Sequence, residues 1–118
     1  MTRPAKAWTV RLTAAAEADF REILLWTDEQ FGEPQAFAYA DTLALALEAL
    51  HKGPETIGVK PRDDIMKGLL SLHVARQGRK GRHFIIFRVA SGSHIEVLRI
   101  LHDSMDLPRH LRDEREDR

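Results

Sequence analysis

Two apolar runs separated by a Ser-Gly-Ser turn constrain the fold of this chain more than any other feature. Residues 82–90 contain the run Phe-Ile-Ile-Phe, and residues 94–102 are nearly as apolar. Continuous runs of strand-forming residues are typical of central strands covered on both faces. The turn at residues 91–93 joins them as a hairpin. Because 118 residues is about the size of one domain, both strands should belong to a single sheet.

Periodicity places two further strands and two helices around this hairpin. Alternating apolar residues predict strands over residues 7–12 and 70–75, and residues 14–30 and 34–51 have helical spacing. A glycine and a proline between the helices suit a short connection, so the helices should form a hairpin. The order predicts an α+β fold, β-α-α-β-β-β, with a helical hairpin packed on an antiparallel sheet.

The same spacing predicts which helical face contacts the sheet. In the first helix this face comprises Ala16, Phe20, Ile23, Leu24, Thr27 and Phe31. In the second it comprises Phe37, Ala40, Ala44 and Leu47, with Leu43 and Leu50 beside them. Trp26 lies off the stripe and marks a candidate partner surface.

The segments outside these elements define the domain. Residues 52–69 are too long for an ordinary loop, so this segment is functional, partly helical or misread. Residues 106–111 should form one amphipathic turn that ends a single domain, residues 1–111. Residues 112–118 alternate in charge and are expected to form a frayed tail.

Composition excludes several protein classes. The chain has no cysteine, which rules out disulfides, thiolate zinc sites and thiol chemistry. No apolar run approaches the ~18 residues of a membrane span, and the basic start is not followed by a signal-type apolar segment. We therefore expect a cytoplasmic protein without a membrane partner.

The net charge of zero hides an asymmetry between the halves. Residues 1–58 carry five basic and nine acidic side chains, whereas residues 59–108 carry nine basic and five acidic ones. Such a difference indicates either a basic working surface for an acidic partner or two solvated faces of opposite sign.

Six cations of the second half lie on the last three strands or their first turn: Arg76, Arg79, Lys80, Arg82, Arg88 and Arg99. We expect them near one sheet edge or face, where they could bind RNA, DNA or an acidic peptide. Arg88 and Arg99 interrupt apolar strands and should be partly buried. The alternative is that both pair with Glu96 or Asp103, or emerge at a sheet edge.

Six histidines are spread along the chain without a metal-binding helix motif. A zinc site from His73, His83 and His94 is conceivable on paired strands but lacks carboxylate or cysteine company, so no metal or other cofactor is predicted. General acid–base chemistry by His83 or His102 beside arginines is the more plausible role.

Taken together, the segments resemble the ParE/RelE superfamily of toxins from bacterial type II toxin–antitoxin systems. The resemblance covers nearly all of residues 10–111. The ParE branch fits best, because Arg-Ile-Leu-His ends the last strand and Asp-Leu-Pro follows it. The fragments that carry the resemblance are residues 12–20, 31–32, 61–63, 67–72, 84–89, 95–102 and 106–108.

This resemblance implies a toxin that inhibits DNA gyrase, promoting gyrase-dependent DNA damage and arresting growth without enzymatic activity. The alternative is a RelE-like, ribosome-dependent mRNA endonuclease using Arg76, Arg82, Arg99 and His102. Such nucleases usually carry a Tyr, His or Glu near the C-terminus, and here the sole tyrosine, Tyr39, lies in the second helix. A third hypothesis is a decayed toxin that only titrates antitoxins.

The resemblance also implies a cognate acidic antitoxin, ParD-like, that wraps around the toxin. Operator DNA would be contacted only through that antitoxin. The residues expected to bind the target or the antitoxin are Arg76, Arg82, Arg88, Arg99 and Trp26.

Overall fold

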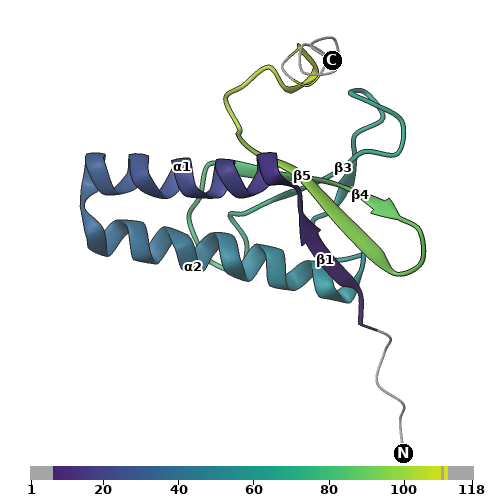
Figure 1. Cartoon of the computed structure of the whole chain (residues 1–118), viewed down its shortest axis with the longest axis horizontal. Coiled ribbons are helices and arrows are strands. Elements are labelled where there is room, and N and C mark those ends of the chain that lie inside the picture. The colour runs from purple at the N-terminus through teal and green to yellow at the C-terminus, as the bar shows by residue number, and fades with distance from the viewer. Residues whose placement is uncertain (1–6, 110, 112–118) are drawn as a thin grey trace, which may run out of the picture.

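The structure, a computed structural model, describes residues 7–109 and 111 and contains two helices packed on a five-stranded sheet (Figure 1). The sheet order is β1-β5-β4-β3-β2. The elements in chain order are β1 (Thr9–Leu12), α1 (Ala14–Phe31), α2 (Glu33–Ala49), the short 3₁₀ helix η1 (Leu50–Lys52), β2 (Lys60–Pro61), β3 (Leu70–His73), β4 (His83–Ala90) and β5 (His94–His102). The predicted α+β class is confirmed, and the predicted elements occur in the predicted order, with the two-residue strand β2 added between α2 and β3.

The sheet differs from the prediction in the direction of one strand. Strands β2 to β5 pair antiparallel, but β1 pairs parallel to β5, with Val10 opposite Ile95. The direction of β1 could not be predicted because no hairpin turn links it to β5. The helical hairpin carries the chain away between them, so β1 reaches the sheet beside the last strand in sequence.

The two helices form the predicted hairpin, connected by Gly32 alone. Thr13 begins α1 by accepting a hydrogen bond from the N–H of Ala16. Gly32 has φ +91°, a conformation that favours glycine, and its N–H donates to the Asp28 carbonyl. Pro34 then occupies the first turn of α2.

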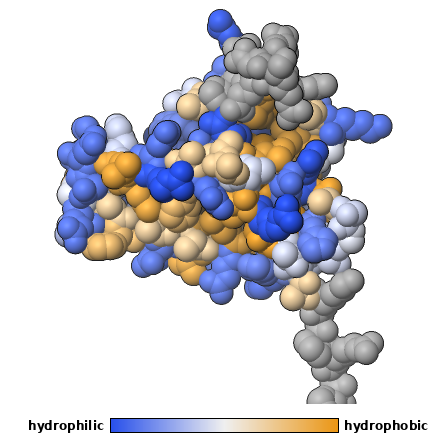
Figure 2. Space-filling view, in the orientation of Figure 1, coloured by the Kyte–Doolittle hydropathy of each residue, from blue (hydrophilic) through white to orange (hydrophobic). Residues whose placement is uncertain are grey.

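The tip of this hairpin extends beyond the sheet, which overturns part of the predicted apolar stripe (Figure 1). Phe31 and Phe37 are mostly exposed, and Ala44 is exposed as well. The spacing was helical, but no strand covers Phe31 and Phe37 near the tip, and Ala44 lies off the face of α2 that buries Thr42, Leu43 and Ala46. Figure 2 shows apolar side chains emerging among charged ones at the tip.

The sheet buries apolar residues on both faces. Beneath the helices, the main core joins the hairpin to β1, β3, β4 and β5 through residues that include Ala16, Leu43, Leu50, Leu72, Ile85, Phe87 and Val97. The opposite face holds a smaller core of Leu69, Ile86, Leu101, Leu107 and Leu111. Burial on both faces explains why the two central strands are apolar almost throughout.

Residues 52–69, which resisted interpretation, are ordered by pairing and packing. They contribute the edge strand β2, and the N–H of Arg62 donates to the Leu69 carbonyl to close the following loop. Ile65 and Met66 from that loop pack on the smaller core. The segment therefore covers the second face of the sheet.

The C-terminal part of the domain contributes to the same cover. Residues 107–109 and 111 are helical, and Leu107 and Leu111 face the smaller core, as the amphipathic turn predicted. The predicted frayed tail, residues 112–118, lies outside the described residues. In the part of the chain that the structure describes, neither helix has the length and apolar content needed to cross a bilayer.

Candidate functional site

The arginines of β4 and β5 do not form one cationic face. Arg99 is largely buried, as predicted, with 16% of its side chain exposed. Its partner is Asp19 of α1: Nε donates to Oδ2 at 2.7 Å and the guanidinium donates to Oδ1 at 2.9 Å. The pairing with Glu96 or Asp103 that the sequence suggested is therefore wrong for Arg99; Glu96 pairs with Arg88 instead, and Asp103 with His73 and Arg82.

Arg88 lies on β4 and remains exposed, so the expectation of partial burial is wrong for this residue. Its guanidinium pairs with Glu96 of β5 at 2.8 Å, which is the pairing that the sequence allowed. The two residues are opposite each other in the antiparallel register. Since this pair is solvated, it contributes little to stability.

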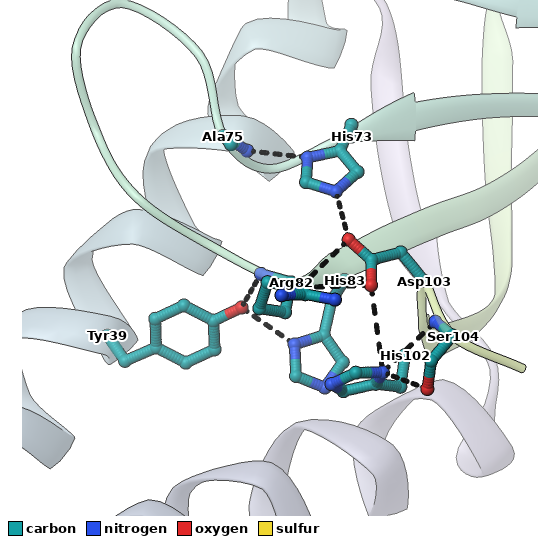
Figure 3. Close-up of polar contacts among 8 residues, drawn as sticks. All are labelled: Tyr39, His73, Ala75, Arg82, His83, His102, Asp103 and Ser104. Atoms are coloured by element: carbon teal, nitrogen blue, oxygen red, sulfur yellow. Dashed lines mark hydrogen bonds and ion pairs between the residues drawn. The ribbon is translucent and has the colours of Figure 1, made fainter.

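Polar side chains from α2, β3, β4 and β5 meet where β3 and β5 end and β4 begins. We call this group the histidine cluster; it consists of Tyr39, His73, Arg82, His83, His102, Asp103 and Ser104. Figure 3 shows Tyr39 reaching from α2 to His83, with Asp103 and His102 on the other side of the group. The pairing of His83 with His102 across β4 and β5 fixes this geometry.

Tyr39 connects the cluster to the helical hairpin. Its hydroxyl oxygen accepts the N–H of Arg82 at 3.0 Å and lies 2.6 Å from Nδ1 of His83. The hydroxyl and this ring nitrogen thus share a short hydrogen bond. Burial, with a smaller effect from His102, lowers the pKa of His83 to about 4, so this ring is neutral at pH 7. Burial also raises the pKa of Tyr39, which stays protonated.

Asp103 contacts two further members of the histidine cluster, His73 and Arg82. It accepts a hydrogen bond from His73 Nε2 at 2.9 Å and is paired with Arg82 Nε at 3.1 Å. The hydrogen bond from His73, together with Arg82, lowers the pKa of this carboxyl. Because the N–H of Ala75 donates to Nδ1 of His73, the ring carries its proton on Nε2. Nε2 of His73 is thus the donor to Asp103.

Ser104, the residue after Asp103, fixes the orientation of the His102 ring. The backbone N–H of Ser104 donates to its Nδ1 at 3.1 Å, so the ring proton sits on Nε2. Nδ1 lies 3.7 Å from Asp103 Oδ1, too far for a hydrogen bond. The cluster thus places three imidazoles beside the ion pair of Arg82 with Asp103. Among the described residues, no three His, Cys, Asp or Glu side chains are arranged to hold a metal ion.

Two grooves adjoin this region and differ in chemistry. The larger, about 1260 Å³, runs between the end of α2, the segment after η1 and β3. We call it the aliphatic groove because its apolar lining includes Leu45, Ile57, Leu72 and Val74. Arg76 lines it, with its guanidinium donating to the Ile57 carbonyl.

The second groove, about 890 Å³, lies between the helical hairpin and the turn before β4. Its large apolar side chains are Trp26, Phe31 and Tyr39, so we call it the aromatic groove. Arg79, Lys80, Arg82 and His102 complete its lining.

The structure thus divides the predicted site residues. It brings Trp26, Arg82 and His102 together at the aromatic groove and places Arg76 in the aliphatic one. Arg88 and Arg99 sit in ion pairs elsewhere.

Sequence reasoning missed two residues, Asp19 and Tyr39. Asp19 is a carboxylate beside the apolar face of α1, and its expected burial could have indicated an arginine on a strand as its partner. The contact of Tyr39 with His83, 44 positions away, left no local pattern.

Comparison with known proteins gives consistent matches. A family model described as "ParE toxin of type II toxin-antitoxin system, parDE" matches residues 10–107. A relative named Toxin ParE1 from Caulobacter vibrioides is 31% identical over 101 residues, covering 86% of this chain and 95% of the relative. A Toxin ParE1 from Mycobacterium tuberculosis is 33% identical over 100 residues, covering 85% and 94%.

Solved structures share the fold at lower identity. The chromosomal ParDE system from P. aeruginosa matches with a TM-score of 0.66 at 20% identity, covering 80% of this chain and 95% of that one. The toxin–antitoxin complex RelBE2 from M. tuberculosis matches with a TM-score of 0.56 at 20% identity, covering 86% and 97%.

Proposed function

Because the chain belongs to the ParE toxin family of type II toxin–antitoxin systems, we propose that it arrests growth by inhibiting DNA gyrase and is neutralised by a cognate antitoxin. One observation carries this proposal: the family match spans residues 10–107, which include both helices and all five strands except Thr9, the first residue of β1. Two relatives named Toxin ParE1, each covered over more than nine-tenths of its length, support it.

Inhibition without catalysis fits the geometry better than RNA cleavage does. Of the four residues in the nuclease alternative, only Arg82 and His102 lie at one groove. Arg76 lines the other groove, and Arg99 is paired with Asp19. A nuclease site needs cations and a proton-transfer group on the same phosphodiester, and these four residues are spread over three places.

The aliphatic groove is the proposed antitoxin site. Ile57, 88% exposed, and Leu45 offer apolar surface that a partner would cover. Basic side chains outnumber acidic ones on the lining: Lys52, Lys60, Arg76 and Arg79 against Glu48 and Glu55. An acidic antitoxin segment with apolar anchors would gain both burial and charge complementarity here. Operator DNA would then be contacted through the antitoxin.

Controlled expression in a bacterial host tests the toxin function. Induction of the chain should arrest growth and activate the DNA-damage response before protein synthesis falls, and co-expression of the antitoxin should restore growth. Collapse of protein synthesis first, with cleaved ribosome-bound message, would instead establish the nuclease. Antitoxin binding without any arrest would identify a decayed toxin, which also contradicts the proposal.

A pair of matched variants tests the docking site. Ile57→Glu introduces a charge into the aliphatic groove, and Val89→Glu does so at an exposed apolar residue of β4 outside the groove. We expect Ile57→Glu to weaken binding of the cognate antitoxin by at least about tenfold. Val89→Glu should bind as the parent does. Equal affinity of the parent and both variants would exclude this groove.

A further inference from the structure

The aromatic groove has a composition unlike that of the aliphatic groove. Its apolar lining beyond alanine and glycine is entirely aromatic, supplied by Trp26, Phe31 and Tyr39. Among the described residues that line it, there is no branched aliphatic side chain and no carboxylate. A peptide helix docks its apolar face into a hydrophobic groove, whereas much of this lining is polar or cationic, so this surface suits a different ligand.

The two exposed aromatics form a fixed platform at the tip of the helical hairpin. Trp26 is 57% exposed, and its ring meets Phe31 edge to face with centroids 5.8 Å apart. This contact holds both rings against each other while their remaining faces stay open to solvent. Flat, preorganised faces of this kind stack on planar ligands with little loss of entropy.

Cations lie on the opposite wall, in the turn before β4. The guanidinium of Arg79 donates to the Thr42 hydroxyl at 2.9 Å and to the Ala38 carbonyl at 3.2 Å. Both partners are neutral, so these contacts fix the position of the charge without cancelling it. Lys80 is exposed on the same turn, and Arg82 leaves 70% of its side chain exposed while pairing with Asp103.

We infer that the aromatic groove binds single-stranded nucleic acid, with bases stacked on Trp26 and Phe31 and phosphates against Arg79, Lys80 and Arg82. Proteins that bind single strands without sequence preference combine these two features, an aromatic platform and a cationic track. Duplex DNA would not bind in this way, because its bases are already stacked. The aliphatic groove is a poorer candidate because Glu48 and Glu55 line it and would repel phosphates.

This inference does not depend on the proposed function, since binding of a single strand requires neither gyrase nor an antitoxin. RNA and DNA share the chemistry on which it rests. The groove would let the toxin hold an exposed strand directly.

Fluorescence anisotropy of labelled oligothymidylate and oligouridylate, each about twelve nucleotides long, tests the binding with the full chain. We expect saturable binding of one or both, weakened by salt with a log–log slope of about −0.7 per phosphate contact. The same thymidylate annealed to its complement should bind more weakly. Equal binding of the duplex, or no binding of either single strand at low salt, would overturn the inference.

Matched variants separate stacking from general charge attraction. Trp26→Leu should weaken binding about tenfold, as expected for loss of one stacked base, whereas Phe37→Leu removes an equally exposed aromatic outside the groove and should have no effect. Lys80→Gln should lower the salt slope, unlike Lys67→Gln. Tryptophan quenching by the oligonucleotide should disappear in Trp26→Leu.

Competition with polyglutamate decides between a nucleic acid and an acidic polypeptide. The oligonucleotide should resist displacement by polyglutamate of equal charge, because glutamate offers no base to stack. Equal competition, with no effect of Trp26→Leu, would mean that the groove binds anionic polypeptides by charge and would overturn the inference.

Discussion

Asp19 on α1 accepts two hydrogen bonds from the guanidinium of Arg99 on β5 and a third from the backbone N–H of Ile100, at 2.9 Å. This carboxylate lies where β1 has ended and the edge of β5 would otherwise be open. Thr13 pairs with the preceding residues of β5: its N–H donates to the Val97 carbonyl and its hydroxyl donates to the Leu98 carbonyl. The start of α1 thus continues the pairing that β1 begins, and it covers the part of β5 that β1 leaves unpaired.

Removing the carboxylate should destabilise the fold strongly. Asp19→Ala leaves a largely buried guanidinium without this partner and the Ile100 N–H without its acceptor. We expect a loss of about 3–5 kcal/mol in the free energy of unfolding, measured by urea denaturation. The double variant Asp19→Ala, Arg99→Met should recover part of that loss, because a buried apolar pair costs less than a buried charge.

The Arg88–Glu96 pair provides the control. It joins β4 to β5, but it is exposed, so Arg88→Ala should cost less than about 1 kcal/mol. Similar losses for Asp19→Ala and Arg88→Ala would contradict the assigned role of Asp19.

Acid should destabilise the protein through His83. Its pKa of about 4 in the folded chain lies below the usual value of 6.5, so the unfolded chain binds the proton more tightly. The resulting stability is present above about pH 6.5 and is lost as the pH falls toward 4. Because the ring is partly exposed and screened by solvent, we expect a loss of about 1 kcal/mol between pH 7 and 5.

His83→Asn isolates this contribution, since it keeps a polar group near Nδ1 but cannot titrate. Urea unfolding of the variant should show a shallower decline between pH 7 and 5 than the parent. Parallel pH profiles for the two proteins would rule out His83 as the source.

Tyr39→Phe tests the link between α2 and β4. The ring can stay packed, but Arg82 N–H and His83 Nδ1 lose a shared partner. We expect a cost of about 1 kcal/mol and faster hydrogen exchange of the Arg82 amide. The amide of Ile85, in the middle of β4, should keep its relative protection. An unchanged Arg82 exchange rate would refute the hydrogen bond.

Gly53 should tolerate no side chain. It has φ +107°, and a Cβ there would lie 2.7 Å from Nε1 of Trp8, which packs over it. Gly68, with φ +84°, has open space around the same position and serves as control. Gly68→Ala should cost about 1 kcal/mol of backbone strain. Gly53→Ala should cost about 2–3 kcal/mol, because Trp8 must move as well. Equal melting temperatures of the two variants would contradict this packing.

The parts of the fold that could be predicted from the sequence are those determined by interactions between residues close together in the chain. Both helices and the three consecutive strands could be predicted because spacing, caps and turns are local signals. The parallel placement of β1 depends on where a helical hairpin returns the chain, which no local pattern specifies. The exposed Phe37 shows a related failure: helical spacing cannot reveal where the sheet beneath a helix ends.

The site was less predictable than the fold for the same reason. Arg82 and His102 were identified by residue type, and the register of β4 and β5 brings them together. The partners of the strand residues come from the helices. Arg82 is bonded to Tyr39 of α2, and Arg99 is paired with Asp19 of α1. These contacts span 43 and 80 positions and leave no trace in spacing or composition.

Supercoiling of relaxed plasmid by purified DNA gyrase tests the central claim most directly. The full chain, added in increasing molar excess, should suppress supercoiling and cause cleaved DNA to accumulate, and preincubation with the antitoxin should abolish both effects. Normal supercoiling at large excess of folded chain, with no cleaved DNA, would contradict the proposed action on gyrase.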